Sequence, residues 1–246
     1  MVAGSKKARL AALRQRLATL ESGGKAGSVL PFGVATMDGS LPGGGLPLGG
    51  LHELSGQGPD SEDGAVAAAF LAGMLARLSP ERPVLWCLKR ADLHAPGLAL
   101  HGLQPQRLIL ARAPNDQEIL WAMEEGLHSP ALAAVIGEVE TLSALASRRL
   151  QLAAETSGVT GFALSRHSTA TAASSAVTRW RLAALPGSLA AGEPGIGRAL
   201  WRVELLRCRG GVPASWDVEA CDATGLVAFS AALADRSEPR RRRAVG

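Results

Sequence analysis

The chain has 246 residues, of which 47% are apolar and 20% charged, and this suits one sizeable globular domain with short extensions. No run of about 18 uncharged apolar residues occurs, and no apolar run with a small-residue cleavage site follows the basic N-terminus. We therefore expect neither a membrane span nor a signal peptide, and we expect a cytoplasmic location.

The net charge of +4 comes from the two ends of the chain. The first 16 residues carry five basic side chains, and the run Arg240–Arg243 carries four. Residues 17–239 hold 17 basic and 22 acidic residues, so the body has a net charge of −5 and is not a basic platform for nucleic acid. The three cysteines have no metal-ligand spacing, so we expect reduced thiols and no metal site; they are Cys87, Cys208 and Cys221.

The first 24 residues predict a separate basic amphipathic helix at 5–21. Its apolar stripe recurs at intervals of 3, 4 and 3 residues, before Gly23 and Gly24 end the pattern. The stripe consists of Leu10, Leu13, Leu17 and Leu20. It has to pack on something, and two interpretations stay open: it covers the helix's own domain, or it binds a partner.

After a glycine-rich stretch at 41–50, apolar strands alternate with helices. Asn115 is placed to cap one of these helices, and the strand at 131–137 is continuously apolar, as a strand covered on both faces is. We expect strands at 51–55, 84–88, 107–111, 131–137 and 159–164, and helices at 64–78, 115–128 and 143–156. This alternation predicts an α/β fold with a mostly parallel central sheet and helices on both faces.

The pattern changes after residue 165. A small-residue loop at 166–175 precedes strand-like segments with no helix between them, so we expect antiparallel strands that extend the sheet. These segments are 177–185, 198–207, 215–220 and 226–230. We assign 28–232 to one domain and expect 235–246 to be a disordered basic tail.

The segment from Leu41 to Gly64 resembles the start of the RecA ATPase core, where a P-loop joins a strand to a helix. In a P-loop, backbone N–H groups and a lysine bind the phosphates, and a Ser or Thr binds Mg²⁺. If Gly64 matches the second P-loop glycine, Pro59 matches the first, and Ala65 and Val66 replace the lysine and the Ser/Thr.

The same loop carries three carboxylates that would repel a phosphate, namely Asp60, Glu62 and Asp63. We interpret it as an ordinary strand-loop-helix turn with Asp63 as N-cap.

The RecA resemblance implies that two further residues needed for ATP hydrolysis are replaced in this chain. Arg90 lies where RecA-like proteins have the glutamate that activates water, and Gly137 lies at the Mg²⁺-associated aspartate position. Glu138 should point to the opposite face of its strand, and it could substitute only if the strand bulged or the register shifted. We therefore expect no ATP hydrolysis and no cofactor. The alternative is an ATPase that uses Glu138, with Lys89 or Arg90 reaching in.

Further segments resemble the ImuA family within this superfamily; they are 114–127, 134–139, 164–167 and 175–182, and the resemblance covers about 28–221. It implies a non-catalytic, RecA-like accessory protein of DNA-damage-induced (SOS) mutagenesis and translesion DNA synthesis, located at the nucleoid when DNA is damaged. The implied partners are RecA, an ImuB-type Y-family polymerase homologue and an error-prone C-family polymerase. The alternative is a cell-division inhibitor of the SulA type, which the length of 246 residues disfavours.

DNA binding is expected to be weak and non-specific. The RecA loop after the strand at 159–164 helps to hold single-stranded DNA, whereas the loop here has one arginine and no aromatic residue. The candidate DNA contacts are Arg166, Arg240, Arg241, Arg242 and Arg243. A solubilising tail is the alternative for the last four. We expect the tryptophans to lie in the core or at an interface; they are Trp86, Trp121, Trp180, Trp201 and Trp216.

Overall fold

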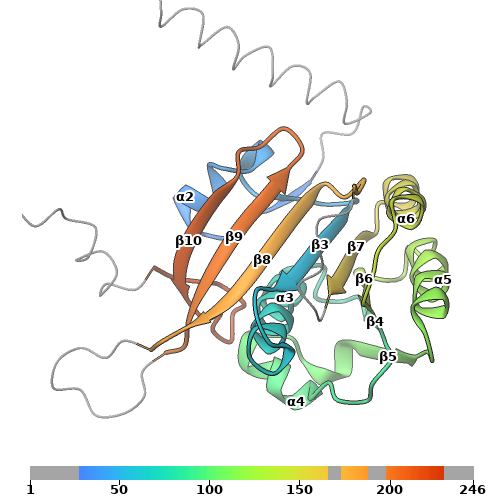
Figure 1. Ribbon diagram of the computed structural model, residues 1–246, viewed down its shortest axis with the longest axis horizontal. Helices are drawn as coiled ribbons and strands as arrows, with labels where there is room; N and C mark the ends of the chain where they lie inside the picture. The colour runs from blue at the N-terminus through green and yellow to red at the C-terminus, as the bar shows by residue number, and fades with distance from the viewer. Residues whose placement is uncertain (1–27, 166–172, 188–197, 230–246) are drawn as a thin grey trace, which may run out of the picture.

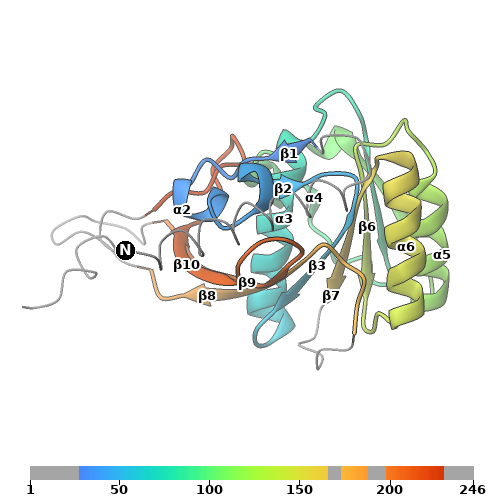
Figure 2. The same ribbon diagram turned by 90° about the horizontal axis from the view of Figure 1, so that it is seen from above.

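A computed structural model describes residues 28–165, 173–187 and 198–229 of the chain. An eight-stranded sheet with the order β10-β9-β8-β3-β7-β6-β4-β5 runs through the described part (Figure 1). Helices flank the sheet on both faces (Figure 2). The predicted α/β fold, with a mostly parallel sheet and antiparallel strands toward the C-terminus, is therefore confirmed. The helix predicted at 5–21 and the tail at 235–246 lie outside the described residues.

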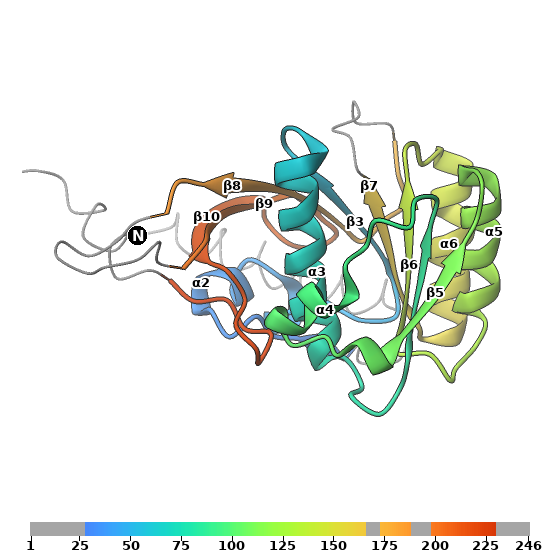
Figure 3. The same cartoon turned by 90° about the horizontal axis from the view of Figure 1, so that it is seen from below.

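Five parallel strands form the half of the sheet that has helices on both faces, with β5 as its half-exposed edge. They are β3 (Leu51–Gly56), β4 (Val84–Leu88), β5 (Leu108–Arg112), β6 (Ala134–Val139) and β7 (Thr160–Ser165). Helix α3 (Ala65–Arg77) lies on one face, with the short α4 (Ala95–Leu98) nearby, and α5 (Asp116–Leu127) and α6 (Ala144–Ser157) lie on the other (Figure 3). All six residues of β6 are buried, as the continuous apolar run predicts.

Local side-chain bonds explain where the helices begin and end. Asn115 caps α5 as predicted, because its side chain accepts a hydrogen bond from the Glu118 N–H at 3.0 Å. The predicted strand at 107–111 begins one residue later, since Arg107 lies in a short helical turn instead. The Arg107 guanidinium donates to the carbonyl oxygens of Leu75 and Leu78 at 3.1 and 2.6 Å, and so it caps the C-terminal end of α3.

The C-terminal strands differ from the prediction in two ways. Strand β8 (Thr178–Leu185) is parallel to β3, and only β9 (Leu200–Cys208) and β10 (Ala214–Glu219) are antiparallel to their neighbours. The direction of β8 depends on its pairing with β3, a non-local contact that the local sequence pattern does not show. The strand predicted at 226–230 is also wrong for its described part, where only an isolated bridge joins Glu219 to Ala228.

The N-terminal part of the domain adds small elements that the sequence does not predict. They are β1 (Val29–Leu30), α2 (Ala35–Asp38) and β2 (Leu46–Pro47), and a short helical turn at Pro42–Gly44 precedes β2. Phe32 and Met37 from this region are almost fully buried. The region therefore completes the core on the α3 side of the C-terminal strands.

Aromatic side chains fill this core. The Trp180 ring centroid lies 5.5 Å from that of Phe32, 6.0 Å from Phe70 and 6.4 Å from Trp216. The predicted core positions of the tryptophans are confirmed for all but one; the confirmed residues are Trp86, Trp180, Trp201 and Trp216. Trp121 is not in the core, since 64% of it is exposed on the outer face of α5.

A buried hydrogen-bond relay joins β2, β3 and β8. The Trp180 Nε1–H donates to Thr178 Oγ1 at 2.7 Å, so the Thr178 hydroxyl hydrogen is left to donate to His52 Nδ1, also at 2.7 Å. His52 Nε2 then carries the ring hydrogen and donates to the Pro47 carbonyl at 2.9 Å. Burial lowers the pKa of the fully buried His52 imidazole from 6.5 to about 4. The relay therefore requires a neutral imidazole of one tautomer.

Acid should destabilise the fold through His52. Because its pKa is lower in the folded than in the unfolded chain, its contribution is complete above pH 6.5 and is lost as the pH falls toward 4. The expected loss is about 3 kcal/mol of unfolding free energy, at about 1.4 kcal/mol per pKa unit. Urea denaturation at pH 7 and pH 4.5 should show a smaller loss in His52→Gln than in wild type. The matched control is His128→Gln, at an exposed position, which should keep the wild-type loss. Equal losses in wild type and His52→Gln would contradict the argument.

Candidate functional site

The loop between β3 and α3 lies at the carboxyl end of a parallel strand, where ligands of open α/β sheets bind. Here the chain passes through a turn at 57–59 and a π-helical turn at Asp60–Gly64 before α3 begins. Ala65 is exposed at the position that matches the P-loop lysine, and Val66 packs in the core at the position that matches the Ser/Thr. Neither side chain can neutralise a phosphate or bind a metal ion.

The Asp63 carboxylate occupies the interior of this loop. The residue is 7% exposed, and its carboxylate accepts hydrogen bonds from the Gly58 N–H at 2.6 Å and from the Ala184 N–H at 2.8 Å. The predicted N-cap role is therefore wrong, because Asp63 accepts from a residue before it and from the end of β8, and not from the first turn of α3. A phosphate would need the same loop N–H groups that this internal anion already uses.

The loop glycines allow this close packing. A Cβ atom at Gly56 would lie 2.8 Å from the Asp63 carbonyl carbon, and one at Gly58 would lie 2.9 Å from the Asp63 carboxylate. Close packing against Asp63 therefore explains why these two positions are glycine, without any nucleotide.

The two cations considered for an unconventional phosphate site lie in different places. The Arg90 guanidinium lies beside the loop, with Nη2 3.9 Å from an Asp60 oxygen and 2.8 Å from an Asp92 oxygen. Lys89 instead points toward the start of α5, with Nζ 2.6 Å from Glu140 and 2.9 Å from Asp116. The hydrogen bonds that Lys89 donates to the Glu140 and Asp116 carboxylates raise its pKa. The structure therefore brings Arg90, but not Lys89, to the loop.

Gly137 and Glu138 lie on opposite faces of β6, as the sequence predicts. Gly137 faces α5, where an added Cβ would lie 2.1 Å from the Met123 sulfur. Glu138 is 5% exposed and accepts a hydrogen bond from Trp86 Nε1 at 2.8 Å, so it lies on the α3 face without any bulge in β6. Glu138 thus lies on the same face as the loop, so the prediction that it needs a bulge or a register shift to reach that face is wrong. Gly137, which is matched to the Mg²⁺-associated aspartate, faces away from the loop.

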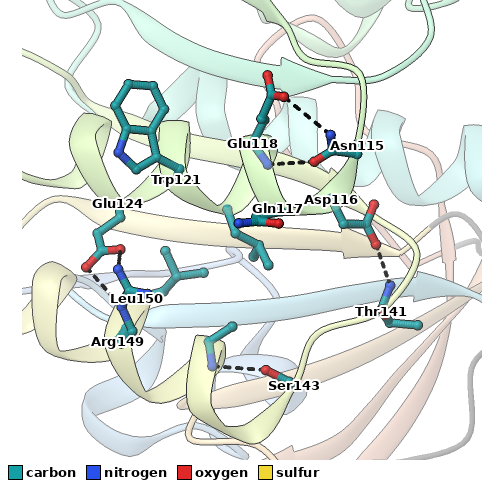
Figure 4. A pocket seen from close by; sticks show the side chains of 12 residues that line it. Asn115, Asp116, Gln117, Glu118, Trp121, Glu124, Thr141, Ser143, Arg149 and Leu150 are labelled. Atoms are coloured by element: carbon teal, nitrogen blue, oxygen red, sulfur yellow. Dashed lines mark hydrogen bonds and ion pairs between the residues drawn. The ribbon is translucent and has the colours of Figure 1, made fainter.

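Sequence reasoning missed a groove of about 600 Å³ between α5 and α6 (Figure 4). An ion pair from Arg149 on α6 to Glu124 on α5 crosses it, and Trp121 stands at its rim. The lining comprises Asn115, Asp116, Gln117, Glu118, Leu120, Trp121, Glu124, Thr141, Ser143, Ala146, Arg149 and Leu150. The only sequence signal was a tryptophan in the apolar run 119–123 of a helix that is acidic at both ends, and helical periodicity alone did not show that it faces outward.

Several predicted site residues lie outside the part of the chain that the structure describes: Leu10, Leu13, Leu17, Leu20, Arg166, Arg240, Arg241, Arg242 and Arg243. Within the described ranges, no group of three or more side chains is arranged to hold a metal ion. The helices in those ranges are too short or too polar to cross a bilayer.

Comparison with known proteins identifies relatives over most of the chain. The chain is 41% identical over 206 residues to Protein ImuA of Caulobacter vibrioides, in each of two strains. The alignment covers 79% of this chain and 84% of each relative. No family model matches the chain.

Replacing the internal anion should destabilise the loop. In Asp63→Asn, one of the two N–H donors loses its acceptor and faces an amide hydrogen, so we expect the free energy of unfolding to fall by about 1–3 kcal/mol. Urea denaturation measures this loss. The matched control is Glu62→Gln, which removes an exposed charge from the same turn and should change stability by less than about 0.5 kcal/mol. Unchanged stability in Asp63→Asn would show that the loop does not depend on the carboxylate.

Proposed function

Because this chain belongs to the ImuA family, we propose that it is a non-catalytic accessory protein of DNA-damage-induced mutagenesis that acts in translesion DNA synthesis. The comparison confirms the family that the sequence predicts. In this role the chain works through protein contacts, and the family resemblance implies RecA, an ImuB-type polymerase homologue and an error-prone C-family polymerase as partners.

The position of Asp63 carries the proposal that no ATP chemistry takes place. An ATPase of this fold class needs loop N–H groups, a cation and a metal ligand around the phosphates. In this chain the Gly58 N–H is bonded to Asp63, and the positions of the cation and the metal ligand hold Ala65 and Val66. A bound phosphate would have to displace a buried carboxylate and then share the site with it, at a large electrostatic cost.

The predicted helix at 5–21 is the candidate element for partner contact. Its stripe of four leucines can bury apolar area, and the five basic side chains in the first 16 residues can steer it toward an acidic surface. The four arginines of the tail supply, in this proposal, weak and salt-sensitive contacts to DNA.

A second candidate function, a weak unconventional ATPase, has two observations in its favour. Glu138 lies on the α3 face of the sheet, and Arg90 lies beside the loop. Against it, Glu138 accepts a hydrogen bond from Trp86, and Asp92 and Asp60 lie within 4 Å of the Arg90 guanidinium. We therefore favour the non-catalytic function.

Nucleotide binding separates the two candidates. We expect the purified chain to show no saturable binding of a fluorescent ATP analogue in the micromolar range, since the loop holds its own anion. RecA under the same buffer and Mg²⁺ conditions is the positive control. Saturable binding that is lost in Arg90→Ala would favour the ATPase and would overturn the non-catalytic proposal.

Partner capture tests the role of the leucine stripe. Immobilised full-length protein should retain RecA and the ImuB-type partner, and Leu13→Asp/Leu17→Asp should weaken capture at least about tenfold, since each buried leucine contributes about 1.5–3 kcal/mol. The matched control is Ala8→Asp/Gln15→Asp, which adds the same charge on the opposite face of the predicted helix. Failure of the wild-type protein to retain either partner would remove the proposed function. If both double variants weakened capture equally, the leucine stripe would have no specific role in partner binding.

A further inference from the structure

We propose that the groove between α5 and α6 is an internal docking site for the predicted N-terminal helix, residues 5–21, of the same chain. The proposal combines the apolar rim of the groove, its acidic wall and the place where the chain enters the described domain.

The outer faces of α5 and α6 carry apolar side chains that nothing in the described part of the chain covers. Trp121 on α5 is 64% exposed, and Leu145 and Leu152 on α6 are 72% and 51% exposed. Leu120 and Leu150 line the groove beside them. Surface helices ordinarily turn polar residues outward, and clustered apolar exposure of this kind is typical of an interface.

The α5 wall of the groove is acidic. This helix carries four carboxylates and no lysine or arginine; they are Asp116, Glu118, Glu124 and Glu125. Arg149 pairs with Glu124, and Lys89 pairs with Asp116 and with the nearby Glu140. The net charge at the N-terminal end of the groove is still negative after these pairings. Three carboxylates lie there with the single positive charge of Lys89; they are Asp116, Glu118 and Glu140.

The segment at 5–21 has the complementary chemistry. Its leucine stripe matches the apolar rim, and its basic side chains match the acidic wall; they are Lys6, Lys7, Arg9, Arg14 and Arg16. Three of these five lie at its beginning. Its one acidic residue, Glu21, lies at its end.

The chain enters the described domain beside the C-terminal end of α6, about 12 Å along this helix from Leu150, the last α6 residue that lines the groove. The Leu48 N–H donates to the Ser28 carbonyl at 2.9 Å, and the neighbouring Gly49 packs against Gly158, which ends α6. The six residues at 22–27 reach at most about 20 Å, so the predicted helix can start its return path beside the C-terminal end of α6. A second copy is not needed to supply the helix.

Length and charge then agree on one orientation. A helix of 17 residues is about 25 Å long, and the 14-residue α6 is about 21 Å long. A helix that runs back along the groove from Gly158 brings Lys6, Lys7 and Arg9 to the end that holds Asp116 and Glu118. The entry of the chain beside Gly158 favours this direction, and it is also the direction that pairs opposite charges.

Docking in this groove would cover the same leucines that the proposed function assigns to partner contact. The partner would then have to displace the helix from its own domain, so contact would be regulated by that competition. Only this regulatory consequence rests on the proposed function, and the docking itself does not.

Photo-cross-linking in the full-length protein alone tests the docking. With p-benzoylphenylalanine in place of Gln117, which is exposed and lines the groove, irradiation should yield cross-links to residues 1–25. In a mixture of ¹⁵N-labelled and unlabelled protein, each cross-linked peptide pair should carry a single isotope. The same probe at Ser215, exposed on β10, is the position control and should yield none to that segment.

Charge reversal sharpens the test. Lys6→Glu/Lys7→Glu/Arg9→Glu should lower the cross-link yield about tenfold, as the loss of three exposed ion pairs predicts. Arg240→Glu/Arg241→Glu/Arg242→Glu makes the same change of charge at the other end and should keep the yield. Absent cross-links to 1–25, equal yields from Ser215, or pairs of mixed isotope would each overturn the proposal. RecA and the ImuB-type partner are not present, so failure here is distinct from failure of partner capture.

Discussion

The two halves of the sheet meet at β3, and the junction depends on a histidine that must stay uncharged. His52 lies on β3 between β7 and β8, and its two ring nitrogens are bonded to Thr178 and Pro47. A charged imidazole would carry a hydrogen on both nitrogens, and the Thr178 hydroxyl hydrogen would then have no acceptor there. Burial keeps the ring neutral, and the Pro47 carbonyl, which can only accept, fixes the ring hydrogen on Nε2. The two hydrogen bonds of the ring then hold β2, β3 and β8 in alignment.

The aromatic core depends on the same relay. Trp180 donates to Thr178 and packs against Phe32, Phe70 and Trp216, which come from the N-terminal region, α3 and β10. Its indole therefore has its polar atom bonded and its apolar body buried among three separate elements. This explains how a long antiparallel extension is held onto a parallel α/β sheet through one strand.

The loop after β3 is closed by an anion of the chain itself. Gly56 and Gly58 pack closely against Asp63, and its carboxylate accepts a hydrogen bond from the Gly58 N–H. The surface of α5 and α6, unlike this closed loop, is open to contact. There Trp121 is exposed on α5, an acidic helix. An exposed tryptophan over an acidic helix accords with the proposal that this member of the ImuA family works through protein contacts.

The sequence by itself determined the fold class and the family, because these follow from local patterns: apolar periodicity, the Asn115 cap and the segments that resemble ImuA. It also placed Gly137 and Glu138 on opposite faces of their strand, since strand periodicity requires it. Only the tertiary structure decided which of those faces meets α3, because that depends on the packing of non-local elements. The direction of β8, the role of Asp63 and the exposure of Trp121 were decided in the same way. Each depends on contacts between segments far apart in the chain, such as Asp63 with Ala184, and a local pattern does not carry that information.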